Sequence, residues 1–205
     1  IYDRLVGSEM CIRDRDTTAG EVLDGGDTHT EIEADTATIT ADGGIGESTG
    51  SGADAALETS LTTLNATTTA GSIQIDEADG VTLASVTAGG AGDVRIVSAT
   101  GDLDVQVVTA ADDLVALTAT SGAINDASGT EADNITASDV ALRASTGIGD
   151  ASTDADDLDL AVTNLAATTA TGDISISDDG TLDVTTVDGL MAVSYTHLRA
   201  HETVV

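Results

Sequence analysis

The chain has 205 residues, with six Lys or Arg against 37 Asp or Glu and a formal net charge of −31 at pH 7. This charge excludes nucleic-acid binding as a default function, because phosphate contacts need Lys and Arg, and it disfavours docking on anionic lipid. The chain has no Pro, Trp or Phe, and no apolar run approaches the ~20 residues of a membrane span. Because aromatic side chains supply much of the buried area in ordinary cores, the composition favours a thin, repetitive architecture over a compact enzyme domain.

The two ends of the chain, residues 1–15 and 192–205, differ in composition from everything between them. They hold both tyrosines, the only cysteine and four of the six basic residues. A permitted codon spelling of residues 3–15 has a reverse complement that reads, in one frame, as residues 192–204. The shared DNA segment resembles a transposase-type sequencing adapter, so we expect both ends to be adapter-derived artefacts.

Residues 16–191 then remain as a repetitive fragment of a longer protein, with 33 acidic residues against two arginines. Within it, residues 57–75 and 158–176 are identical at nine of nineteen positions, at an offset of 101 residues. The triplet Gly-Ile-Gly also recurs upstream of each copy, at residues 44–46 and 147–149. A long internal repeat therefore organises the chain.

A shorter unit of about 20 residues begins at Gly71, at Gly92 and at Gly172. Each unit has an alternating strand, an acidic or polar turn with glycine, and a second alternating strand, as in "GSIQIDEADGVTLASV". Alternation with period two places the aliphatic side chains on one face of a half-buried strand. Residues 57–64 carry leucines at helical spacing, but the copy beginning at residue 158 alternates, so we predict a strand in both.

Coils of about 20 residues with two or three short strands predict an all-β fold, a parallel β-solenoid (β-helix) in which each coil bonds to its neighbours. A tandem β-sandwich array is the alternative, because a repeat of 101 residues would suit one sandwich domain. A largely disordered chain is a third possibility. The shorter repeats have no natural place in a Greek key, which favours the solenoid.

The repeats resemble those of filamentous-haemagglutinin-type bacterial surface adhesins. The resemblance rests on "TASDVALRASTGIGDAS" from Thr136, on "NLAATTATGDISISDDGTLDV" from Asn164 and on the earlier copies. It implies a β-helical shaft of a large secreted or cell-surface protein, so we expect an extracellular or cell-surface location. The expected partners are flanking repeats of the same chain and surface ligands, without nucleic acid and without membrane insertion.

We do not expect an enzyme. Paired acids are frequent throughout the chain and by themselves say little about acid–base catalysis. Two alternative functions remain open. The first is an adhesive array of calcium-rigidified β-sandwich repeats. The second is an enzyme fragment of the polysaccharide-active β-helix kind, and the basic residues it would need could come only from Arg95 and Arg143. The triplet "NIT" at Asn134 matches a glycosylation acceptor, but such triplets are common by chance in a Thr-rich chain.

The acidic turns are the candidate metal ligands, and calcium is the candidate cofactor, because hard cations take oxygen ligands. Asp76, Glu77 and Asp79 in "DEADG" occupy places equivalent to Asp178 and Asp179 in "SDDG". The alternative is a solvated acidic face. Because coils stack about 4.8 Å apart, acids at equivalent turns should repel one another, so we expect folding to depend on ions even without a defined site.

Overall fold

The computed structural model describes residues 12–17, 20–24, 29–46, 56–149, 157–178, 180–191 and 198–200, with 12–17 and 198–200 described as backbone alone. These residues form strands and turns, and no helix lies among them. The strands, in chain order, are β1 (Ile12–Thr17), β2 (Ile32–Ala41), β3 (Leu57–Thr68), β4 (Ile73–Glu77), β5 (Val81–Thr87), β6 (Val94–Ser98), β7 (Leu103–Val105), β8 (Val108–Ala119), β9 (Ile124–Asp126), β10 (Ile135–Ala144), β11 (Leu158–Ala161), β12 (Asn164–Thr169), β13 (Ile174–Asp178), β14 (Asp183–Val184) and β15 (Leu198–Ala200).

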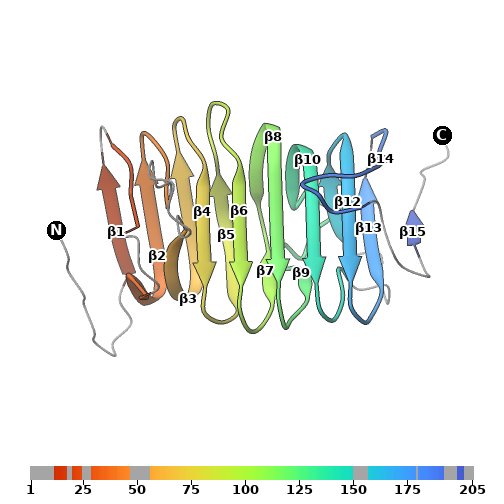
Figure 1. Ribbon diagram of the computed structural model, residues 1–205, viewed down its shortest axis with the longest axis horizontal. Helices are drawn as coiled ribbons and strands as arrows, with labels where there is room; N and C mark the ends of the chain where they lie inside the picture. Colours follow the sequence, from red (N-terminus) through yellow and green to blue (C-terminus); the bar gives the residue numbers. More distant parts are fainter. Residues whose placement is uncertain are drawn as a thin grey trace.

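All the named strands that pair do so in parallel, and they lie side by side along the long axis of the molecule (Figure 1). One column of paired residues shows how the chain winds. Ile73 pairs with Val94, Val94 with Val115, Val115 with Val140, and Val140 with Leu165. The chain thus returns to the same column at each turn, in stacked coils of about 22 residues that form a β-solenoid of about five turns. The prediction of a parallel β-solenoid is confirmed, and the β-sandwich alternative is wrong.

The core is a continuous column of aliphatic side chains, because period-two alternation points every second residue inward. All five residues of that column are fully buried. Four residues further along these strands the inward position is small or polar; Glu77 there pairs with Ser98 on one side and with Thr59 of β3 on the other. All three are buried, so the core changes at this corner from aliphatic to polar.

The Gly-Ile-Gly triplets mark places where extra residues are inserted into a strand of the coil. Ile45 pairs with Ile73 and Leu57 with Ile75, so residues 47–56 are an insertion between two adjacent register positions. Gly46, just before this insertion, has a φ of +73°, and a Cβ on it would lie 2.0 Å from the Gln74 carbonyl oxygen.

The second triplet has the same geometry. Ile148 pairs with Ile174 and Leu158 with Ile176, which makes residues 150–157 an insertion of the same kind. Gly149 has a φ of +62°, and its Cβ would lie 2.2 Å from the Ser175 carbonyl oxygen. Only glycine fits both the left-handed backbone and this close approach.

The two copies of the long repeat lie on different sides of the coil. Ile73 belongs to the column that continues through Val94. Its counterpart Ile174 pairs with Ile148, and Ile148 pairs with Ile124 in β9, which belongs to the neighbouring column of β5 and β7. Moving 101 residues along the chain therefore covers four full coils, from Ile73 to Leu165, and then one more side of the coil, from Leu165 to Ile174. Both copies are extended, and the strand predicted over residues 57–64 is confirmed as part of β3.

β1 begins in the N-terminal end segment and runs two residues past it, and β15 lies in the C-terminal end segment; they pair in parallel with β2 and β13. The interpretation of the end segments as adapter-derived rests on the DNA spelling and stays a prediction. Among the described residues, none belongs to a helix long and apolar enough to cross a membrane.

Candidate functional site

Glu77, one of the predicted calcium ligands, points into the core. Its carboxylate accepts hydrogen bonds from the Thr59 hydroxyl at 2.6 Å and from the Leu61 amide at 2.9 Å. Burial raises the pKa of Glu77 to about 7, and a hydrogen bond with Asp79 adds to the rise, while the bonds from Thr59 and Leu61 oppose it. Glu77 thus ties β4 to the preceding coil.

Asp178 repeats this arrangement 101 residues later. Its Oδ2 accepts a hydrogen bond from the Val162 amide at 3.2 Å, and Val162 is the counterpart of Leu61. Its Oδ1 accepts from the Gly180 amide at 2.8 Å. The equivalence of the two acidic turns has a structural basis, since each acid holds an amide of the coil before it.

The described members of the predicted set do not form one site, because Glu77 and Asp178 lie at different turns. Asp76 and Asp79 are exposed near the end of β4, whereas Asp178 ends β13 in another column. Asp179 lies outside the described residues. Within the part of the chain that the structure describes, the predicted set is therefore divided between two turns, and its affinity for calcium stays a prediction.

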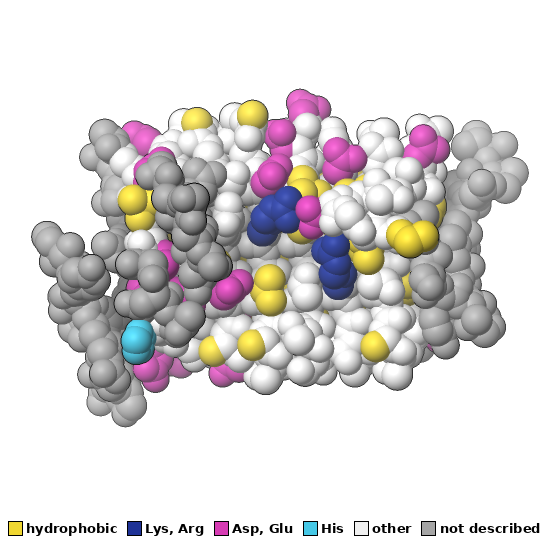
Figure 2. Space-filling model, in the orientation of Figure 1, with side chains coloured by type: hydrophobic (Ala, Val, Ile, Leu, Met, Phe, Trp, Pro, Cys, Tyr) yellow, Lys and Arg dark blue, Asp and Glu magenta, His cyan; other side chains and the backbone are white. Residues whose placement is uncertain are grey.

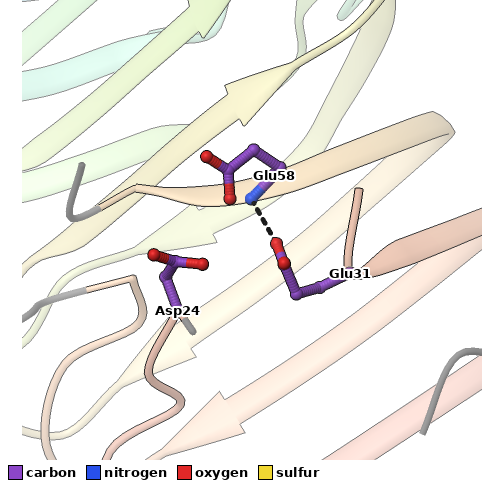
Figure 3. A group of neighbouring side chains, drawn as sticks. All are labelled: Asp24, Glu31 and Glu58. Carbon is purple, nitrogen blue, oxygen red and sulfur yellow. Dashed lines mark hydrogen bonds between the residues drawn. The ribbon is translucent and has the colours of Figure 1, made fainter. Parts of the chain in front are cut away.

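A different acidic group is brought together beside the insertion of residues 47–56. Asp24, Glu31 and Glu58 each place a carboxylate oxygen within 4.8 Å of the others, and all three side chains are partly buried (Figure 3). The Glu31 carboxylate accepts a hydrogen bond from the Glu58 amide at 3.1 Å. Glu58 also pairs in register with Asp76, so one predicted ligand stacks on this group. Such oxygen-only ligands suit a hard cation.

Sequence reasoning missed this group because its members are far apart in the chain. The signal that could have found it is their position. Val22 pairs with Ile45 and Ile32 with Thr59, so extra residues lie between positions 22 and 32 at the same place in the coil. Asp24 and Glu31 stand at the two ends of this stretch, and Glu58 follows the insertion of residues 47–56. Acids at the bases of neighbouring insertions are adjacent only once the coils are stacked.

A second acidic site is a small pocket lined by Glu131, Asp133, Asp159, Leu160 and Ser177. Its volume of about 130 Å³ is below the ~300–1,000 Å³ of ordinary ligand pockets. Asp159 is the buried acid of this pocket, and burial raises its pKa to about 6. Repulsion from Glu131, Asp126 and Asp133 adds to the rise, and a hydrogen bond with Ser177 opposes it.

The backbone of Asp159 is held by Asn134, which is completely buried. Its side-chain nitrogen donates to Asp126 at 2.6 Å and to the Val105 carbonyl at 3.0 Å, and its side-chain oxygen accepts from the Asp159 amide at 2.8 Å. Because this side chain is fully engaged, the "NIT" triplet is not an accessible glycosylation acceptor in the folded chain.

The basic side chains of the described residues gather in the middle of one face, with an acidic and several hydrophobic side chains beside them (Figure 2). Arg95 donates from both terminal nitrogens to the Asp188 carboxylate, each at 3.0 Å. Arg143 donates to the Asp188 carbonyl oxygen at 3.0 Å, and its other terminal nitrogen lies 3.6 Å from the carboxylate. The bond from Arg95 holds the pKa of Asp188 below its ordinary value, and Arg143 contributes to the same effect.

Comparison of the chain with protein-family models, with curated proteins and with solved structures gives no match.

Proposed function

We propose that this chain is a structural stalk segment of a large secreted or cell-surface bacterial protein, without catalytic activity of its own. The observation that carries the proposal is the uninterrupted column from Ile73 to Leu165, in which each coil adds one buried aliphatic residue. Such a stack can be lengthened one coil at a time, since each repeat contacts only its neighbours. The resemblance to adhesin shafts supports the same role.

The insertions support a spacer role as well. Residues 47–56 and 150–157 are added between adjacent register positions, and the stack continues past both. The outer surface can therefore vary without changing the axis or the rise per coil. In this proposal the flanking repeats of the same protein are the principal partners, and surface ligands would contact the outer face or a separate tip.

The proposal is tested by placing the chain between a cell-surface anchor and a fluorescent tip, and measuring the height of the tip above the membrane. Five coils at about 4.8 Å each should raise the tip by roughly 24 Å. Duplicating one coil, residues 94–114, should add about 5 Å. A Gly/Ser linker with the same number of residues is the control, because its height should vary widely. A chain that gives the same broad height distribution as the linker contradicts the stalk.

A second candidate function is favoured by Asp159, whose raised pKa beside other carboxylates is the environment of a general acid. The chain would then act on polysaccharides from the pocket of Glu131, Asp133 and Asp159. Incubation with neutral and acidic polysaccharides, for the parent chain and for Asp159→Asn, separates the two proposals. Turnover that Asp159→Asn abolishes supports the enzyme, and unchanged polysaccharide with both chains supports the stalk.

A further inference from the structure

The outer side of the wall formed by β6, β8, β10 and β12 carries a row of very small side chains beside two arginines. Arg95, Ala116, Ala141 and Ala166 are paired in register, one from each of four successive coils. Arg143 lies two residues after Ala141 and so projects from the same face. The alanines leave room for a backbone to approach closely, and the guanidinium groups lie at one end and one edge of this row.

A hairpin turn of the chain itself occupies this surface. The Val187 amide donates to the Leu190 carbonyl at 3.0 Å, and the Leu190 amide donates to the Val187 carbonyl at 2.8 Å. Between them Asp188 has a φ of +49° and Gly189 a φ of +69°. Two central residues with positive φ and the sequence Asp-Gly are typical of a two-residue type I′ hairpin. The turn is thus closed by two hydrogen bonds of its own. Because an isolated hairpin is only marginally stable in water, these amides stay protected from exchange only while the turn lies on the wall.

The turn fits the surface through three separate contacts. Val187 is only 6% exposed, because it packs on the alanine row, and Leu190 packs beside it. The Asp188 carboxylate receives the two-pronged bond from Arg95. Arg143 contacts the backbone of the turn, because it donates a hydrogen bond to the Asp188 carbonyl oxygen. An aliphatic side chain, a carboxylate and the backbone of a tight turn are therefore all recognised.

Charge makes this recognition selective. Arg95 and Arg143 are the only basic residues between positions 16 and 191, in a chain with a net charge of −31. An acidic segment is therefore repelled by most of this surface and attracted here, although Asp93 also lies close enough to Arg95 to interact with it. Bidentate pairing of a guanidinium with a carboxylate adds geometric selection to the charge.

We propose that the surface formed by Arg95, Arg143 and the alanine row is a binding site for a hairpin turn of the form aliphatic–Asp–Gly–aliphatic, and that residues 187–190 fill it as a releasable strap across four coils. The strap is releasable because its ion pairs are partly open to solvent, with Arg95 39% and Asp188 24% exposed. Salt and substitution can weaken such pairs without unfolding the wall. This inference does not depend on the stalk function.

Release of the strap is measured by amide hydrogen exchange on the full chain. Asp188→Asn and, separately, Arg95→Gln should speed exchange at Val187 and Leu190 about ten- to a hundredfold, because charge-assisted bonds to the turn are lost. Amides of the buried strand β8 should be unaffected. Asp183→Asn, an exposed acid in β14, is the matched control and should change neither. Unchanged exchange at Val187 and Leu190 in both variants overturns the proposal.

Recognition is measured with a labelled cyclic peptide of sequence Thr-Thr-Val-Asp-Gly-Leu-Met. The parent chain should exclude the peptide, the Asp188→Asn chain should bind it, and a peptide with Asn in place of Asp should not bind. Adding Arg95→Gln to the Asp188→Asn chain should abolish binding. The proposal fails if the Asp188→Asn chain does not bind the peptide, or binds it equally well without Arg95.

A second copy of the chain could place its own turn in the same site. Any dimer held together by exchanged straps in this way should be abolished by Arg95→Gln.

Discussion

At the scale of single residues, Glu77 shows how alternation decides the role of an acid. Ile73, Ile75 and Glu77 are successive inward positions of β4, and all three are buried. The aliphatic alternation of the sequence ends at Ile75, which predicts Glu77 as a ligand of the acidic turn, whereas the structure extends the alternation one step further. Its bonds to Thr59 and Leu61 explain why a carboxylate is tolerated there, since buried polar groups need partners.

The pKa of Glu77 predicts a stability that depends on pH. Because burial raises the pKa from 4.5 to about 7, the folded chain holds this proton more tightly than the unfolded chain. The stabilisation from the proton is complete below about pH 4.5, declines as the pH rises, and is lost above about pH 7. Glu77→Gln keeps a neutral acceptor, so it should remove this decline and exceed the parent in unfolding free energy by roughly 1–3 kcal/mol at pH 8.

Urea unfolding of the parent and of Glu77→Gln across pH 4–8 measures this difference. Glu33→Gln, at an exposed position of β2, is the control for removing one negative charge. A difference between parent and Glu77→Gln that stays constant over this pH range contradicts the buried, proton-holding role of Glu77.

At the scale of elements, the strands and the coil could be predicted from the sequence, while the corners and the insertions could not. Period two identifies which residues face inward, and nearly every predicted alternating pair, such as Ile73 and Ile75 or Leu103 and Val105, is buried. Alternation does not show where a coil turns, so the shift of Ile174 to another column was not predictable. The hairpin at Asp188 was missed although its Asp-Gly pair between aliphatic residues is a strong local signal.

The insertion geometry predicts that two glycines with similar backbones differ in their tolerance of a side chain. Gly129 has a φ of +63°, and a Cβ added to it would have no other atom within 4 Å, whereas a Cβ on Gly46 would lie 2.0 Å from a carbonyl oxygen. Gly129→Ala should cost about 1 kcal/mol of unfolding free energy, from the backbone strain alone. Gly46→Ala should cost about 3 kcal/mol or more, because the wall must also move.

Thermal unfolding of both variants measures this difference, with Gly149→Ala as a repeat of the test at the second insertion. Equal losses for Gly46→Ala and Gly129→Ala would show that the chain does not pass as close to Gln74 as the structure indicates.

At the scale of the whole molecule, stacking concentrates negative charge along the outer surface. Glu58 and Asp76 pair in register, which places like charges on adjacent coils. Some equivalent positions avoid this repulsion by placing an amide next to an acid, since Asn125 donates to Asp104 at 2.9 Å and Asn164 to Asp139 at 2.8 Å. The remaining like charges are only partly screened at physiological salt, where the Debye length is about 8 Å.

We therefore expect the melting temperature, followed by far-ultraviolet circular dichroism, to rise with sodium chloride. The calcium prediction adds a further rise in millimolar calcium over sodium chloride of matched ionic strength, and Glu58→Gln should reduce that further rise. A melting temperature that is the same at low and high salt would mean that the stacked acids do not repel one another significantly.

The central claim is that the chain winds as a parallel stack, and one column of outward residues tests it directly. Asp76 pairs with Val97, Val97 with Thr118, Thr118 with Arg143, and Arg143 with Thr168. Spin labels on cysteines at Asp76 and Thr168, in a chain with Cys11→Ser, are four coils apart and should give a narrow distance distribution. Electron–electron double resonance should place its centre near ~19 Å, within the reach of the label linkers. A broad distribution extending well beyond about 40 Å, as expected for an unfolded segment of this length, would contradict the solenoid.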